Sequence, residues 1–180
     1  MSNQFAPMLN DVVSIAIEAG KAILEIYKQP YEVHEKTDGS PVTTADQNAH
    51  NLIEARLREL TPHIPILSEE SAAIEIETRR QWNTFWLVDP LDGTKEFIRK
   101  NDEFTVNIAL MDNGIPVLGV VHTPALDMTH YAASGGGAFK SSGAQVALPI
   151  QCRKFAADNA VMVASRSHSG AAVEHYRTEL

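Results

Sequence analysis

An apolar strand runs directly into an acidic turn in the stretch Trp86-Leu87-Val88-Asp89-Pro90-Leu91-Asp92-Gly93-Thr94-Lys95-Glu96-Phe97. Pro90 fixes the backbone where the strand ends, Gly93 permits a tight turn, and Thr94 is placed to open a helical turn. This order forces Asp89 and Asp92 close together. Two charges about 5 Å apart repel by about 3 kcal/mol at an effective dielectric near 20, so the arrangement predicts a cation between them.

A second acidic group, Glu69 and Glu70, follows a predicted short strand at 64–67. Loops that follow two strands of one sheet can lie side by side, so Glu69, Asp89 and Asp92 are candidates to share one site. Oxygen ligands favour a hard cation such as Mg²⁺ over Zn²⁺, and the 7 histidines show no zinc-ligand spacing. A cation held by carboxylates beside exposed backbone N–H groups suits phosphoryl chemistry.

Two amphipathic helices are predicted before these strands. Apolar residues recur three and four apart over 8–28, between Pro7 and Pro30, and again over 44–60. The polar stretch 34–41 is predicted to be a loop. Thr44 and Gln47 fit a capping box, which places Asp46 in the first helical turn as a good acceptor. Asp46 is a candidate to take a proton from an attacking water, with the Thr94 hydroxyl as its relay or orienting partner.

Strand-sized apolar runs follow at 64–67, 85–88, 104–110, 115–121 and 128–133, with a further one at 160–164. Asn113-Gly114 predicts an antiparallel hairpin. Glycine and serine gather at 135–137 and at 141–143, which is typical of loops, and 135–137 is predicted to be a close-packed strand end. Helices precede strands, so the predicted class is α+β with layered packing. We expect residues 1–150 to form an α+β metal-binding domain and 151–180 to begin a truncated α/β domain.

The composition is that of a globular protein. The chain has 180 residues, of which 44 % are hydrophobic and 21 % charged, enough for one domain or slightly more. A net charge of −8 disfavours binding to a nucleic-acid polymer. One cysteine, Cys152, fits a reduced intracellular compartment, and neither a signal peptide nor a transmembrane segment is predicted. Cys152, Trp82 and Trp86 are expected to be structural.

The acidic stretch admits other interpretations. An Asp-Gly turn and a Ser-Glu-Glu helix start are each often structural. An EF-hand fails, because Lys100 stands where a bidentate Glu is required. A phosphatase with an aspartyl nucleophile needs one residue between its aspartates, whereas two separate Asp89 from Asp92, which changes the direction of the second carboxylate. Such an enzyme would form a covalent adduct on one of these aspartates, and we expect none.

These residues resemble the inositol monophosphatase family of lithium-sensitive, magnesium-dependent phosphatases. The resemblance spans nearly the whole chain, in the family's order, and implies a layered α/β sandwich. It rests on Val42-Thr43-Thr44-Ala45-Asp46, Glu69-Glu70 and Trp86-Leu87-Val88-Asp89-Pro90-Leu91-Asp92-Gly93-Thr94. Two further segments are more similar to the family's bacterial 3′(2′),5′-bisphosphate nucleotidases than to its inositol enzymes: Lys95-Glu96-Phe97 and Ser165-Arg166-Ser167-His168.

The resemblance implies a role for each matched residue. Two or three Mg²⁺ ions would be held by Glu69, Asp89, Asp92 and the Leu91 carbonyl, while Asp46 and Thr94 would activate the water. The N–H groups of Gly93 and Thr94 would hold the scissile phosphate. Lys36 is similar to a family lysine near the metal and anion site. The residues implied to contact the substrate are Glu69, Leu91, Asp92, Gly93, Thr94, Ser167 and His168.

The resemblance further implies hydrolysis of the 3′-phosphate of adenosine 3′,5′-bisphosphate, in sulfur metabolism in the cytoplasm. Two alternatives stay open: an inositol monophosphatase-like sugar-phosphate phosphatase, and an inactive fragment or phosphate-binding module. Family members carry a further metal-ligating Asp in a second domain that nothing in this sequence matches, so we expect a fragment with an exposed apolar face. A homodimer and peripheral association with the inner face of a membrane are compatible with the resemblance.

Overall fold

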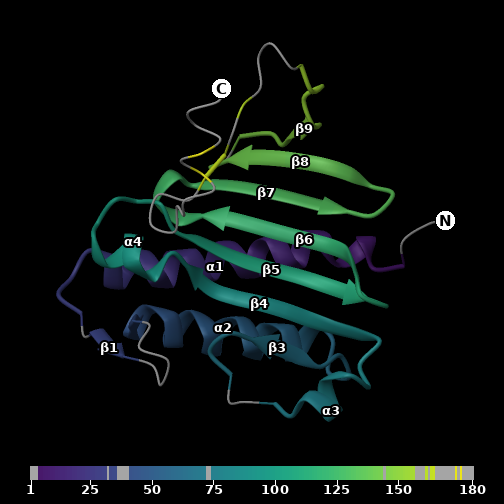
Figure 1. The fold of residues 1–180 in the computed structure, drawn as a ribbon, viewed down its shortest axis with the longest axis horizontal. Helices are drawn as coiled ribbons and strands as arrows, with labels where there is room; N and C mark the ends of the chain where they lie inside the picture. Colours follow the sequence, from purple (N-terminus) through teal and green to yellow (C-terminus); the bar gives the residue numbers. More distant parts are fainter. Residues whose placement is uncertain are drawn as a thin grey trace. The chain divides into compact units, whose positions relative to one another are not determined.

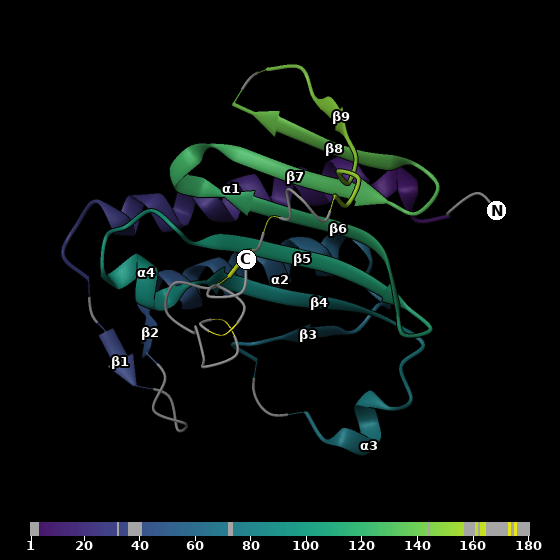
Figure 2. The ribbon, with the colours of Figure 1, turned by 45° about the horizontal axis from the view of Figure 1, so that its top comes forward.

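The structure, a computed structural model, describes residues 4–31, 33–35, 41–71, 74–143, 145–156, 161, 163–164, 173 and 175. The chain divides into two units, Met1–Ile150 and Gln151–Leu180. In the first unit, two long helices cover one face of a seven-stranded sheet (Figure 1, Figure 2). The predicted α+β class with layered packing is confirmed for this unit. That the second unit begins another domain stays a prediction.

The long helices α1 (Leu9–Tyr27) and α2 (Thr44–Leu60) confirm the two predicted helices. Helix α1 follows a short 3₁₀ turn, η1 (Ala6–Met8), and ends before Pro30. Both helices bury residues three and four apart, as an amphipathic face requires. The buried apolar residues are Val12, Ile15, Ala16, Ala19 and Ile23 in α1 and Ala45, Ala49, Ile53 and Leu57 in α2.

The capping box of α2 lies one residue earlier than predicted. Thr43 is the N-cap: its Oγ1 accepts a hydrogen bond from Ala45 N at 3.2 Å, and its own N donates to Asp46 Oδ2 at 2.7 Å. The prediction of a Thr44 and Gln47 box is therefore wrong. The shorter carboxylate of Asp46 closes the box in the place that the pattern gives to Glu or Gln.

The predicted loop at 34–41 is also corrected at its two ends. Strand β1 (Val33–Glu35) pairs antiparallel with β2 (Pro41–Thr43) in a small separate sheet. Valine and threonine in these strands favour extended backbone. Residues 36–40, which include Lys36, lie outside the described residues.

The large sheet confirms five predicted strands. Its order is β3 (Ile66–Ser68), β4 (Thr84–Asp92), β5 (Thr105–Asp112), β6 (Ile115–Thr123), β7 (Met128–Ala133), β8 (Gly137–Ser142) and β9 (Leu148–Ile150). Strands β3 and β4 are parallel, and every other neighbouring pair is antiparallel. The predicted hairpin joins β5 to β6 through Asn113 and Gly114, whose φ angles of 50° and 77° suit a two-residue turn.

One strand at the end of the chain was not predicted, and one predicted strand is wrong. Strand β8 runs from the group 135–137 into the group 141–143, and Gly137 lies at its end, as predicted. Pairing with β7 overrides the weak strand preference of Gly137, Ala138 and Lys140. The run 160–164 was expected to be a strand, yet its described residues 161, 163 and 164 are not in one. A strand requires a partner, and the described part of 151–180 contains no strand that could pair with it.

Three short helical turns complete the first unit: α3 (Ile76–Arg79), α4 (Thr94–Ile98) and η2 (Pro124–Leu126). Helix α4 confirms the turn predicted at Thr94. In the described part of the chain, no helix has the length and apolar character needed to cross a membrane.

The core lies between the helices and the sheet. Trp86, Phe97 and Phe104 are fully buried there, and Trp86 Nε1 donates to Thr61 Oγ1 at 2.9 Å. The opposite face of the sheet exposes apolar side chains, with Leu87 at 43 % and Val121 at 41 % exposure. The expected exposed apolar face is therefore present on the first unit.

Candidate active site

The candidate metal ligands lie where two parallel strands stop pairing. Strand β3 pairs with β4 so that Ser68 lies opposite Val88, and Glu69 and Asp89 are the next residues of each. Glu69 N also donates to the Val88 carbonyl at 3.1 Å. The expectation that these two acidic segments lie side by side is confirmed.

A β-bulge in β4 places Asp89 and Asp92 on one side of the sheet. Asp89 pairs with Asn107 and Asp92 with Thr105, so three steps along β4 match two along β5. In a regular strand, residues three apart point to opposite faces. The extra residue removes that difference, and the two aspartates share a face with Thr105 and Asn107. Asn107 Nδ2 accordingly donates to Asp92 Oδ2 at 3.2 Å.

Asp89 has the largest electrostatic perturbation at this site. Burial, then the charges of Glu69 and Asp92 and a hydrogen bond with Glu69, raise the pKa of Asp89 to about 7. The Leu91 N–H, which donates to Asp89 Oδ1 at 3.2 Å, opposes this increase. When no cation is bound, the Asp89 carboxyl therefore keeps its proton to a higher pH than an ordinary aspartate does. A cation would favour its ionised form, since it would remove the repulsion between the carboxylates.

Asp46 is 1 % exposed and is held by hydrogen bonds on both carboxylate oxygens. Thr43 N and Thr43 Oγ1 donate to Oδ2 at 2.7 and 2.6 Å, and Thr94 Oγ1 donates to Oδ1 at 3.0 Å. Thr94 Oγ1 also lies 3.3 Å from the Leu91 carbonyl. The structure thus brings Asp46 and Thr94 together, as the sequence analysis expected. Their catalytic use stays a prediction.

Gly93 fixes the turn between Asp92 and α4. Its φ of 97° is left-handed, and a Cβ at this position would lie 2.8 Å from the Glu103 carbonyl oxygen and 3.3 Å from Phe104 Cα. Glycine is therefore required here both for its backbone conformation and for the space it leaves. Its own carbonyl accepts from Phe97 N at 2.9 Å, which ties the turn to the helix.

A cavity of about 570 Å³ adjoins the carboxylates. Glu69, Asp89 and Asn107 line it together with apolar residues such as Val121. Arg79 of α3 also lines it, and within the described residues the buried Arg79 Nε has no hydrogen-bond partner. The cavity combines charged and amide groups with an apolar wall, which is a composition suited to small polar ligands.

The oxygen donors present suit magnesium. Within the described ranges, no three His, Cys, Asp or Glu side chains are already grouped to hold a metal ion. The carboxylates of Glu69, Asp89 and Asp92 and the Leu91 carbonyl are nevertheless the ligand types that Mg²⁺ prefers. Added positive charge would relieve the repulsion that Glu69 and Asp92 exert on Asp89. These residues fit the ion, and the metal site stays a prediction.

Three predicted site residues cannot be compared with the structure, and two residues at the site were not predicted. Ser167, His168 and Lys36 lie outside the described residues. Thr43 and Asn107 were not among the predicted site residues. A T-x-x-D pattern before an apolar run is itself a capping signal for Thr43. The signal for Asn107 is an amide in a strand, where asparagine is disfavoured.

Comparison with known proteins finds a family and relatives that match nearly the whole chain. A model described as the inositol monophosphatase family matches residues 5–178. The 3′(2′),5′-bisphosphate nucleotidase CysQ of Escherichia coli (strain K12) is 47 % identical over 175 residues, which cover 96 % of this chain and 69 % of that protein.

Solved structures agree with this assignment. The crystal structure of CysQ from Bacteroides thetaiotaomicron is 39 % identical with a TM-score of 0.76, covering 98 % of this chain and 69 % of that one. The extragenic suppressor protein suhB from Bartonella henselae is 32 % identical with a TM-score of 0.68, covering 76 % of this chain and 53 % of that one. The sandwich fold predicted from the resemblance is therefore confirmed for the matched part.

Proposed function

Because the chain belongs to the inositol monophosphatase family, we propose that it acts as a magnesium-dependent phosphatase that hydrolyses the 3′-phosphate of adenosine 3′,5′-bisphosphate. The observation that carries the chemistry is the contact between Thr94 Oγ1 and Asp46 Oδ1, with the mutually repelling carboxylates of Glu69 and Asp89 in the same unit. The choice of substrate is supported by 47 % identity to a protein named as a 3′(2′),5′-bisphosphate nucleotidase.

Magnesium would be held by Glu69, Asp89, Asp92 and the Leu91 carbonyl, as two or three ions. When bound, it would neutralise charge on the phosphoryl oxygens and make water more acidic. The bulge in β4 supports this assignment, because it gives Asp89 and Asp92 a common face.

Asp46 and Thr94 would remove the proton from the attacking water. Thr94 already donates its hydroxyl proton to Asp46 Oδ1. As Asp46 takes that proton, Thr94 Oγ1 can accept one from water, and the resulting hydroxide attacks phosphorus. The bond from phosphorus to the 3′-oxygen breaks, the 3′-oxygen leaves with the bonding pair and takes a proton from solvent water, and AMP and phosphate are the products. No covalent intermediate forms.

Backbone N–H groups of Gly93 and Thr94 would hold the scissile phosphate, and Ser167 and His168 would contact the nucleotide. The proposed setting is the cytoplasm, where the substrate would be a by-product of sulfate assimilation. Neither a homodimer nor association with a membrane is needed for this chemistry.

The test compares Thr94→Ser, which keeps the hydroxyl and loses the methyl group, with Thr94→Val, which keeps the branched shape and loses the hydroxyl. Phosphate release is measured from adenosine 3′,5′-bisphosphate and from inositol monophosphate, over a magnesium titration. Thr94→Ser should stay within about tenfold of the parent rate, because the donor to Asp46 is retained. Thr94→Val should lose about 10²-fold or more, the usual contribution of positioned proton transfer.

The outcomes separate the candidate functions. Equal rates for the two variants would refute the role of the Thr94 hydroxyl, and release without magnesium would refute the metal assignment. Preference for inositol monophosphate would favour the sugar-phosphate alternative. Phosphate binding by the parent chain without turnover of either substrate would favour a binding module.

A further inference from the structure

His50 lies on the same face of α2 as the candidate base but outside the proposed chemistry. It follows Asp46 by four residues, so the two side chains are neighbours on the helix surface. His50 is 8 % exposed and Asp46 1 %. A buried polar ring must satisfy its nitrogen atoms inside the protein. One contact of the His50 ring stays on α2, and the other leaves the helix for the acidic segment.

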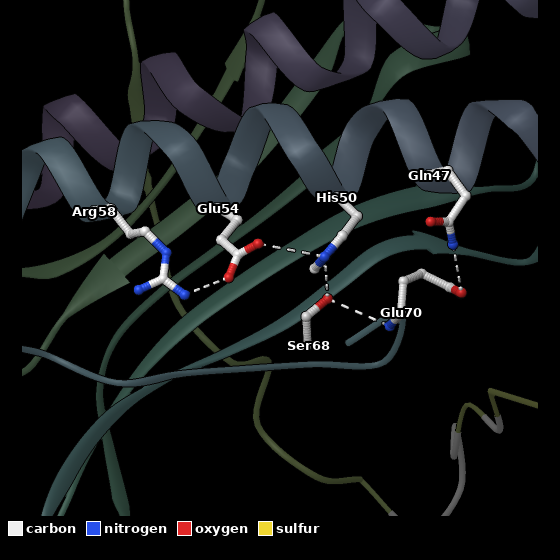
Figure 3. A network of polar contacts seen from close by, with 6 residues as sticks. All are labelled: Gln47, His50, Glu54, Arg58, Ser68 and Glu70. Carbon is white, nitrogen blue, oxygen red and sulfur yellow. Dashed lines mark hydrogen bonds and ion pairs between the residues drawn. The ribbon is translucent and has the colours of Figure 1, made fainter. Parts of the chain in front are cut away.

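The two ring nitrogens of His50 reach different partners (Figure 3). Nδ1 lies 3.0 Å from Ser68 Oγ, and Nε2 lies 3.5 Å from Glu54 Oε2, one helical turn further along α2. Glu54 Oε1 in turn accepts from Arg58 Nη2 at 2.6 Å. A ring protonated on Nε2 satisfies this chain, because Nε2–H then faces the carboxylate and Nδ1 can accept from the Ser68 hydroxyl.

Ser68 connects the His50 ring to the backbone of Glu70, on the far side of Glu69. It is 6 % exposed and is the last residue of β3. Its Oγ accepts from Glu70 N at 3.4 Å, so one hydroxyl joins His50 to the two residues that flank Glu69.

A second contact joins the same segment to α2. Gln47 Nε2 donates to Glu70 Oε2 at 3.3 Å, three residues before His50 (Figure 3). The segment 68–70 is therefore fastened to α2 on one side, while Glu69 N is fastened to Val88 of β4 on the other. Glu69 lies between these attachments.

We propose that His50 is a positioning residue, which holds the segment 68–70 against α2 through Ser68 and so places Glu69 beside Asp89 while Asp46 stays on the same helix. The inference rests on the proposed function, since it concerns the magnesium ligand of that function. Substitution of a residue that supports a metal ligand commonly changes metal affinity by about tenfold to a hundredfold. The reason is that a ligand displaced by about 1 Å no longer contacts the ion properly.

Three substitutions at one position separate positioning from burial. His50→Ala removes both ring contacts. His50→Asn places an amide near the position of Nδ1 and keeps the contact with Ser68, whereas His50→Gln places the amide near Nε2, toward Glu54. Magnesium affinity, measured by titration calorimetry of the chain, should fall about tenfold in His50→Ala and in His50→Gln. It should return to within about threefold of the parent in His50→Asn.

His122 provides a matched control. It is 3 % exposed and its Nδ1 lies 2.9 Å from Thr129 Oγ1, the same kind of contact in β6 and β7. His122→Ala should lower the unfolding temperature as His50→Ala does, but leave magnesium affinity unchanged. An equal loss of affinity in both alanine variants would overturn the proposal, because general destabilisation would then explain it.

A second measurement needs no magnesium. Amide hydrogen exchange of Glu69 and Glu70, followed by NMR, should be faster in His50→Ala and return toward the parent rate in His50→Asn. Unchanged exchange in His50→Ala would overturn the proposal. If the parent chain did not bind magnesium, the proposed function would fail, and exchange alone would decide whether His50 holds the segment.

Discussion

Gly93 should tolerate a side chain far less well than Gly114, although both have left-handed backbones. Their φ angles are 97° and 77°, so alanine at either position meets the backbone cost of about 1 kcal/mol or more for an L-residue. The surroundings differ. A Cβ on Gly114 would have no atom within 4 Å, whereas one on Gly93 would lie 2.8 Å from the backbone oxygen of Glu103.

The expected sizes follow from this difference. Gly114→Ala should cost about 1 kcal/mol, which lowers the melting temperature by roughly 2–4 °C for a chain of this length. Gly93→Ala adds an overpacked contact worth about 1–3 kcal/mol, since a backbone oxygen cannot rotate away as a side chain can. Its total cost should be about 3 kcal/mol, or roughly 6–12 °C.

Calorimetric melts of the parent chain and the two variants, under one buffer without metal, measure both shifts. The informative quantity is the difference between the variants, because the cost of the left-handed backbone is common to them. Equal shifts would refute the claim that the Glu103 backbone leaves no room at Gly93. The rigid turn before α4 would then have no steric basis.

Three further outcomes are expected. Thr43→Val keeps the shape of the α2 cap but loses the hydroxyl that donates to Asp46. The free energy of unfolding, measured in urea, should therefore fall by about 1–2 kcal/mol. An unchanged midpoint would contradict the capping box. Asp89→Asn should stabilise the metal-free chain at pH 8, because the pKa of about 7 makes the ionised Asp89 carboxyl unfavourable in the folded state at that pH. The same variant should abolish stabilisation by magnesium. A variant less stable than the parent would argue against repulsion at Asp89. Burial lowers the pKa of His122 below its usual 6.5. The neutral ring therefore provides its full stability above pH 6.5, and this stability is lost as the pH falls through the lowered pKa. Unfolding midpoints at pH 7.5 and 5.0 should therefore differ less in His122→Gln than in the parent, and the same pH dependence in both would exclude His122 as its source.

Periodicity predicted the parts of the fold that local sequence determines. The two helices and five strands follow from spacings of apolar residues, and the Asn113-Gly114 turn from the φ angles that its residues accept. Strand β8 could not be found in this way, because Gly137, Ala138 and Lys140 disfavour a strand and pair only when β7 is present as a template. Local patterns describe what a segment prefers, and not what its neighbours impose.

The candidate site was predicted in its residues but not in its geometry. Charge repulsion between Asp89 and its neighbours was expected from their spacing, and the raised pKa of Asp89 agrees with it. The bulge was not expected, since it exists only in the register between β4 and β5. The contact of His50 with Ser68 was also beyond reach, because 18 residues separate the two and neither belongs to a recognisable motif.

The bulge in β4 has a consequence for the length of this strand. Within the fully described strands β4 and β5, Pro90 and Leu91 are left without paired residues between Asp89 and Asp92. Deleting one of them would restore a regular ladder and still leave both aspartates on one face, at a spacing of two. The deletion would, however, remove the Leu91 carbonyl oxygen, which the bulge frees from strand pairing and which Thr94 Oγ1 contacts. Natural variants of this turn should therefore tolerate a change of side chain at Leu91 far more readily than a change in the number of residues.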